Sequence, residues 1–100
     1  MTEREFKAWL AKAKTGDTAV YHVGHLAFDS RENVDLARVG ARAYLGMQRG
    51  FLTLVQRRVE GRREYLAIAR EGAHRARDLM LNRDDIAERA GVANGKKLAA

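Results

Sequence analysis

The sequence predicts a small α+β domain: a helix, a short strand and a second helix, then a β-hairpin and C-terminal helical segments. Two segments, residues 3–14 and 36–50, place apolar residues at helical intervals. Within residues 51–70, two runs rich in β-branched and aromatic residues meet at a glycine. A chain of 100 residues, 46% of them hydrophobic, suffices for one core. We therefore expect residues 1–93 to form one domain and residues 94–100 to fray.

The first helix is predicted over residues 3–14. Thr2 and Glu5 have the spacing of a capping box at its start. Its apolar face is formed by Phe6, Trp9, Leu10 and Ala13. Residues 18–28 then carry β-branched and aromatic side chains, interrupted by Gly24, and are predicted to form a short strand or extended arm.

A second helix follows a polar cluster, residues 29–33, that offers several capping side chains. Its apolar face consists of Leu36, Val39, Gly40, Ala43, Tyr44 and Met47. The helix should end near Gly50. Arg38 and Arg42 are four residues apart, and we expect them on one exposed stripe opposite the apolar face.

The most informative segment is the hairpin predicted over residues 51–70, with its turn at Glu60-Gly61. Glycine supplies the positive φ that a tight hairpin turn needs. The stem residues expected to pack on the helices are Leu52, Leu54, Leu66 and Ile68. The residues that flank the turn with positive charge are Arg57, Arg58, Arg62 and Arg63. Because side chains alternate along a strand, at most two of these arginines share a face.

Two helical segments are predicted after the hairpin, over residues 73–81 and 84–90. The order of elements is that of a winged-helix-like domain, although one of the usual three helices is missing before the hairpin. Residues 85–98 resemble the core of helix-turn-helix regulators, but a helix that ends at Gly91 explains them better.

The composition favours some classes of partner and excludes some kinds of site. The formal net charge is +6, and its largest share falls in residues 51–81, which favours a polyanionic partner. The absence of cysteine excludes disulfides and thiolate metal sites. No apolar run approaches the roughly 20 residues that a membrane-spanning helix needs. We therefore expect a cytoplasmic protein that has no membrane partner.

The candidate site is a nucleic-acid interface formed by Arg57, Arg58, Arg62 and Arg63. Arginines that neutralise phosphates release counterions, which gives salt-sensitive affinity for DNA or another nucleic acid. Arg38, Arg42 and Arg49 on the second helix would extend this interface. The alternative for the turn arginines is an edge hairpin that its charges keep soluble. The alternative for the helix arginines is an ordinary solvated helix face. For sequence-specific reading by the helix, the solvated face is the favoured interpretation.

Other chemistries find little support. His22 and His25 should point to opposite faces of a strand, and only His74 could join them, so no metal site is predicted. Ser30 is the only serine and lies in a cap, and no nucleotide-binding motif occurs, so we expect neither an enzyme nor a cofactor. The aromatic residues that offer stacking platforms for bases, or more simply core, are Phe6, Trp9, Phe28, Tyr44, Phe51 and Tyr65.

A resemblance is carried by Tyr21–Ala27, the amphipathic helix after it, and the stretch from Leu54–Arg58 through Tyr65–Ala67. Together they are similar to small uncharacterised proteins of bacteriophages and prophages that have a winged-helix-like layout. The resemblance implies either a DNA-binding factor or a host-directed inhibitor that binds a bacterial protein. A nucleic-acid mimic should be acidic, whereas this chain is basic. A protein-interaction module, including a homodimer through the hairpin edge or an exposed helix, stays open as the alternative.

Overall fold

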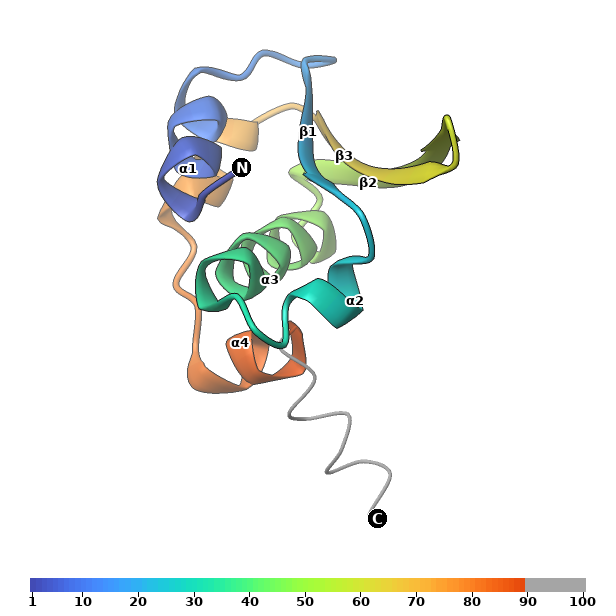
Figure 1. The fold of residues 1–100 in the computed structure, drawn as a ribbon. Helices are drawn as coiled ribbons and strands as arrows, with labels where there is room; N and C mark the ends of the chain where they lie inside the picture. The colour runs from blue at the N-terminus through green and yellow to red at the C-terminus, as the bar shows by residue number, and fades with distance from the viewer. Residues whose placement is uncertain (90–100) are drawn as a thin grey trace.

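The computed structural model describes residues 1–89 (Figure 1). It is an α+β structure in which helices cover one face of a three-stranded antiparallel sheet. The elements are α1 (Glu3–Lys12), β1 (Thr18–Val23), α2 (Leu26–Asp29), α3 (Val34–Gln48), β2 (Leu52–Val59), β3 (Arg62–Ala69), the 3₁₀ helix η1 (Ala73–Asp78) and α4 (Arg83–Arg89). The expected tail, residues 94–100, and the second half of the helix-turn-helix resemblance lie outside the described residues.

α1 begins as the sequence predicts. Thr2 Oγ1 accepts a hydrogen bond from the Glu5 backbone N–H, and Glu5 Oε1 accepts one from the Thr2 N–H, which completes the capping box. Phe6 and Leu10 point into the core and are fully buried. The helix is two residues shorter than expected because Ala13 adopts an extended conformation.

The segment between β1 and α3 contains a helix where an extended arm was expected. β1 ends at Val23, and Gly24 turns the chain with a φ of +134°. His25 caps α2, because its Nδ1 accepts a hydrogen bond from the Phe28 N–H at 3.3 Å. The expectation of an extended chain up to Phe28 is therefore wrong. Four residues are too few to produce a helical period in the sequence.

α3 is the central helix, packed between the sheet, α1, η1 and α4. Asn33 caps it by accepting a hydrogen bond from the Leu36 N–H. A Cβ at Gly46 would lie 2.8 Å from Leu52 Cδ1, so glycine permits close packing on β2. The buried residues of α3 are Leu36, Ala37, Val39, Gly40, Ala41, Arg42, Ala43 and Gly46. No helix within residues 1–89 is both long and apolar enough to cross a membrane.

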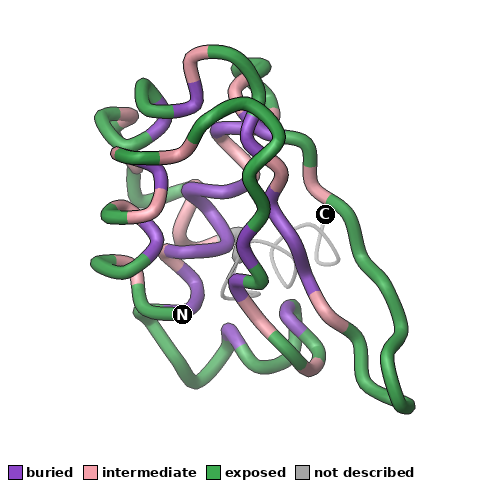
Figure 2. Tube along the Cα trace, turned by 90° about the horizontal axis from the view of Figure 1, so that it is seen from above, coloured by how far each residue is buried: buried purple, intermediate pink, exposed green. Residues whose placement is uncertain are grey.

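The hairpin of β2 and β3 forms as predicted, and β1 adds to its other side to give the strand order β1-β3-β2. Glu60 and Gly61 have φ values of +51° and +78°, which suits the tight hairpin turn expected there. The turn end of the hairpin extends past the helices (Figure 1) and is exposed along its length (Figure 2).

The apolar stem residues divide between the two faces of the sheet. Leu52 and Leu54 face the helices, with Leu52 1% exposed. Leu66 is the cross-strand partner of Val55 and points to the opposite face, as does Ile68 two residues later. The expectation that all four pack on the helices is wrong for Leu66 and Ile68, because the register pairs odd and even positions of the two strands.

Arg42 joins three parts of the fold. Its side chain is 5% exposed, and its Nη1 donates to the carbonyl oxygens of Arg77 at 3.1 Å and Leu79 at 2.8 Å. Its Nη2 lies 3.1 Å from Glu3 Oε2, and Arg38 Nε lies 2.7 Å from Glu3 Oε1. The predicted exposed stripe is thus wrong for Arg42. A carboxylate 39 residues earlier in the chain makes burial of this charge tolerable.

Glu3 should make stability depend on acidity. Burial raises the pKa of Glu3, but hydrogen bonds from Arg38 and Arg42 outweigh it and hold the pKa below 4.5. Its stabilising contribution is therefore complete above the unfolded pKa and is lost as pH falls through the lower folded value. We expect Glu3→Gln to reduce the free energy of unfolding at neutral pH and to reduce it less in acid. Urea denaturation of both proteins at neutral and at acid pH measures this. If Glu3→Gln reduced the free energy of unfolding equally at the two pH values, the expectation would be wrong.

Candidate nucleic-acid interface

The four arginines around the hairpin turn divide evenly between the faces of the sheet. Arg58 and Arg63 are direct cross-strand partners on the face that carries the helices. Arg57 lies on the opposite face, where its Nε is 2.7 Å from Oε1 of its partner Glu64. Arg62 shares that face. The expectation that no face holds more than two of these arginines is confirmed.

Arg58 and Arg63 form a pair of like charges. Like charges directly opposite one another on antiparallel strands are destabilising. Among residues 1–87, no carboxylate makes an ion pair with Arg58, Arg62 or Arg63. An anionic group held between Arg58 and Arg63 would relieve their repulsion, so this pair is suited to bind one.

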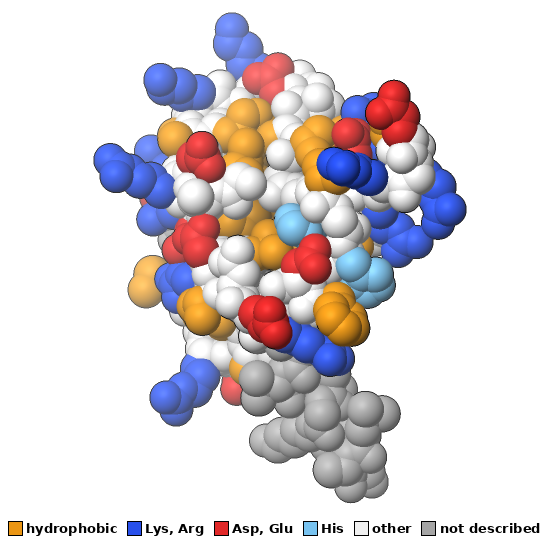
Figure 3. Space-filling view, in the orientation of Figure 1, with side chains coloured by type: hydrophobic (Ala, Val, Ile, Leu, Met, Phe, Trp, Pro, Cys, Tyr) orange, Lys and Arg blue, Asp and Glu red, His pale blue; other side chains and the backbone are white. Residues whose placement is uncertain are grey.

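A groove follows the helix-facing side of the hairpin. We call it the hairpin groove and define it by His25, Gln56, Arg58, Arg63 and Tyr65. One hollow of about 410 Å³ is bordered by His25, Gln56, Arg63 and Tyr65. Two smaller hollows of about 320 and 370 Å³ lie toward the turn, and Arg63 borders all three. Arg57 and Arg62, from the opposite face, each border one of the smaller hollows, which therefore reach the edge of the hairpin. Basic side chains gather over the hairpin with histidine beside them (Figure 3).

A hydrogen-bonded corner fixes one wall of the hairpin groove. Asp29 Oδ2 accepts hydrogen bonds from His22 Nε2 at 2.7 Å and from the His25 backbone N–H at 3.0 Å. The bond from His22, followed by the bond from His25, lowers the pKa of Asp29. A carboxylate that only accepts requires the proton on His22 Nε2. The corner holds His25 at the edge of the groove.

The aromatic residues expected as stacking platforms mostly belong to the core. Phe6 is fully buried and Tyr65 is 5% exposed. The Tyr65 hydroxyl accepts a hydrogen bond from the Leu26 N–H at 3.0 Å, which ties α2 to the sheet. The half-buried members are Trp9, Tyr44 and Phe51. Phe28 differs from all of them, because its side chain lies on the surface, 65% exposed.

The arginines of α3 lie apart from the hairpin groove. Arg38 and Arg42 are held by Glu3, as described above. Arg49 is exposed at the end of α3 that leads into β2. The length of β2 separates that end from Arg58 by about 20 Å at roughly 3.3 Å per residue. The structure therefore does not bring the seven predicted arginines together on one surface.

Sequence reasoning identified neither Gln56 nor His25 as a site residue. Gln56 was within reach, because strand alternation puts it on the same face as Arg58, two residues away. His25 was not, because its place depends on the turn at Gly24 and on α2, which the sequence pattern does not reveal.

The hairpin groove thus combines an unneutralised arginine pair, polar side chains and adjoining hollows. In the described part of the chain, no three histidine or carboxylate side chains gather in a way that could hold a metal ion. No protein-family model, no curated protein and no solved structure matches the chain.

Proposed function

We propose that this chain is a non-enzymatic nucleic-acid-binding domain that holds a phosphate backbone in the hairpin groove. The observation that carries the proposal is the direct opposition of Arg58 and Arg63, to which no carboxylate of residues 1–87 is paired. Arg62 adds charge at the turn, whereas Glu64 neutralises much of the charge of Arg57. The net charge of +6 favours the encounter with a polyanion.

We also propose that the domain is winged-helix-like and that the protein comes from a phage or prophage. The order α1-β1-α2-α3-β2-β3 supports the layout, since α2 supplies the helix that the sequence pattern lacked. The hairpin takes the place of the wing (Figure 1). α3 differs from a recognition helix, because most of its residues from Leu36 to Gly46 are buried. Binding is therefore assigned to the hairpin groove and not to α3.

The test is a pair of double variants that remove the same charge from opposite ends of the sheet. We expect Arg58→Ala with Arg63→Ala to weaken oligonucleotide binding at low salt roughly tenfold or more. The slope of log affinity against log salt should also fall by about 1 to 2, because two phosphate contacts are lost. Fluorescence anisotropy with labelled single-stranded and duplex oligonucleotides at several salt concentrations measures both.

Arg49→Ala with Arg70→Ala is the matched control, because both side chains are exposed and make no ion pair with residues 1–87. This control should retain most of the affinity. Equal losses from the two double variants would show that net charge acts without the hairpin groove. Failure of the unmodified protein to bind any oligonucleotide at low salt would overturn the proposal.

A protein-interaction module is the second candidate, and the outer face of the sheet favours it. Val20 and Val55 flank Leu66 on that face and are 37% and 38% exposed. Such a surface suits a second copy of the chain or a host protein. Light scattering that finds a stable dimer, together with no binding of nucleic acid at low salt, would favour this candidate.

A further inference from the structure

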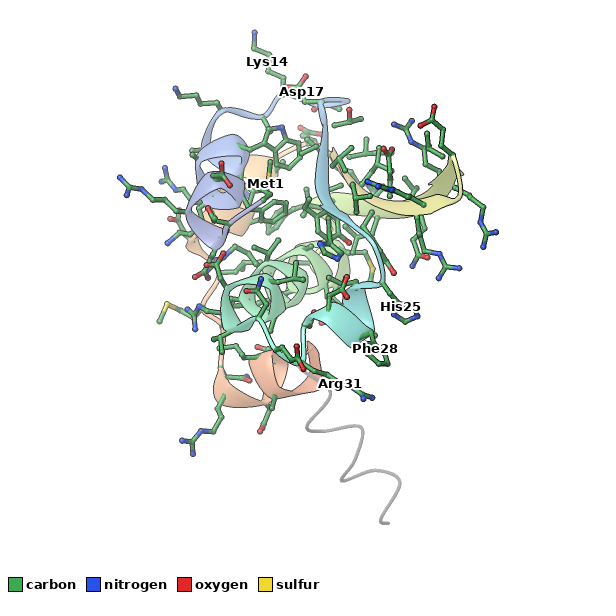
Figure 4. The ribbon with its side chains drawn as sticks, viewed as in Figure 1. Met1, Lys14, Asp17, His25, Phe28 and Arg31 are labelled. Atoms are coloured by element: carbon green, nitrogen blue, oxygen red, sulfur yellow. The ribbon has the colours of Figure 1, made fainter. Side chains whose placement is uncertain are left out.

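Phe28 is the exposed aromatic residue beside the hairpin groove. It lies on α2 and is 65% exposed. The His25 ring meets it edge-on with 6.0 Å between ring centroids, and Arg31 Cζ lies 5.3 Å from the Phe28 centroid. Neither contact buries the ring. Three planar groups thus line up on the surface, and Figure 4 shows them following one another along one flank of the molecule.

His25 connects this flank to the hairpin groove. It borders the hollow shared with Gln56 and Tyr65 as well as the one shared with Arg58 and Arg63. A strand whose phosphates lie on the two arginines therefore passes His25 before it reaches Phe28. Aromatic side chains next to a positively charged groove are the combination with which proteins bind single-stranded nucleic acids.

α3 does not have the exposed face of a helix that reads a duplex. A helix that reads a major groove must present an exposed face, but α3 is buried over most of its length. A duplex keeps the faces of its bases stacked, so a phenylalanine ring reaches a base face only at an end or by forcing two base steps apart, which costs the free energy of unstacking them. An unpaired strand can turn a base onto the ring.

We propose that the nucleic acid bound in the hairpin groove is single-stranded, with one base stacked on Phe28. This inference rests on the proposed function and names its substrate class. Arg58 and Arg63 hold the backbone, and the Phe28 ring receives the base. The hollow of about 410 Å³ bordered by Gln56 and His25 offers polar groups to the edge of a neighbouring base.

The experiment compares a mixed-sequence single strand with the blunt duplex of the same sequence, by fluorescence anisotropy at one salt concentration. We expect the single strand to bind about tenfold tighter or more. Phe28→Ala should remove most of this preference while the salt dependence stays the same, because no phosphate contact is lost. A single strand of abasic sites should bind the unmodified protein and Phe28→Ala equally.

Two variants separate stacking from simple apolar contact. Phe28→Tyr keeps a flat ring and should keep the preference, whereas Phe28→Leu keeps apolar area and should lose it. Because Phe28 is exposed, circular dichroism should show that all three variants fold. Equal binding of single strand and duplex, or full single-strand affinity in Phe28→Ala, would overturn the inference. If either result occurs and Arg58→Ala with Arg63→Ala still weakens binding, the proposed function stands and only the single-strand inference fails. If the protein binds neither the single strand nor the duplex, both proposals are refuted.

Discussion

Arg42→Ala is expected to lower the free energy of unfolding by about 2–4 kcal/mol, because it removes a nearly buried guanidinium that donates three hydrogen bonds. The variant leaves Glu3 Oε2 and the carbonyl oxygens of Arg77 and Leu79 without the donor that serves them. It also removes the contact that joins α1, α3 and the C-terminal end of η1. Urea denaturation followed by circular dichroism and by fluorescence of Trp9, the single tryptophan, measures the loss.

Arg38→Ala is the matched control, because Arg38 pairs with the same carboxylate from a more exposed position. Its side chain is 38% exposed, against 5% for Arg42. Exposed ion pairs contribute about 0–1 kcal/mol, so the control should be only slightly destabilised. Arg42→Lys should fall between the two, because an ammonium keeps the charge but cannot reach three acceptors in the geometry of a guanidinium. Similar losses for Arg38→Ala and Arg42→Ala would show that burial of Arg42 adds nothing.

Arg42 also shows where sequence reasoning about this chain fails. The helical period correctly predicted the apolar face of α3, but it assigned Arg38 and Arg42 to solvent by their type. Whether a charged residue is exposed depends on what packs against it. Here the partners are Glu3 and the backbone after η1, which are distant in the sequence, and no local pattern of α3 encodes them.

The hairpin was predictable because its signals are local. Alternation, β-branched residues and glycine at position 61 all act within a few residues of the turn. The division of the turn arginines between two faces followed from alternation alone. The pairing of Leu66 with Val55 also follows from the predicted turn, because a two-residue loop at positions 60 and 61 fixes the register of the hairpin. The expectation that all four stem residues pack on the helices did not use this register.

α2, in contrast to the hairpin, was not predictable from the sequence. Its four residues, Leu26–Asp29, show no period, and the expected extended arm carried no hint of the groove wall. The bonds that establish it run from Asp29 back to His22 and from Leu26 to the Tyr65 hydroxyl on β3. The candidate site was thus predictable only in part. The arginines around the hairpin turn followed from the sequence, whereas Arg38, Arg42 and Arg49 lie elsewhere. The wall opposite the turn arginines depended on tertiary contacts.

Gly24→Ala should remove that wall. Gly24 has a φ of +134°, a conformation that residues with a Cβ rarely adopt, and holding alanine there costs about 1–3 kcal/mol. An added Cβ would also lie 2.7 Å from Asp29 Oδ2 and 3.2 Å from His22 Nε2. We therefore expect a loss of stability in urea denaturation. We also expect weaker single-strand binding, because the bond between His22 and Asp29 must break or move.

Gly16→Ala separates the cost of the positive φ from the cost of the clash. Gly16 has a φ of +94°, but no atom lies within 4 Å of the added Cβ. It should show the backbone cost alone and leave oligonucleotide binding unchanged. Gly24→Ala with Asp29→Ala removes the clashing carboxylate, so it should recover part of the stability. It should not recover single-strand binding, because Asp29 accepts the His25 N–H and so orients α2 and Phe28. If Gly24→Ala and Gly16→Ala lost the same stability, the hydrogen bonds of Asp29 to His22 and His25 would adjust to the added Cβ at no cost. They would then not position Phe28.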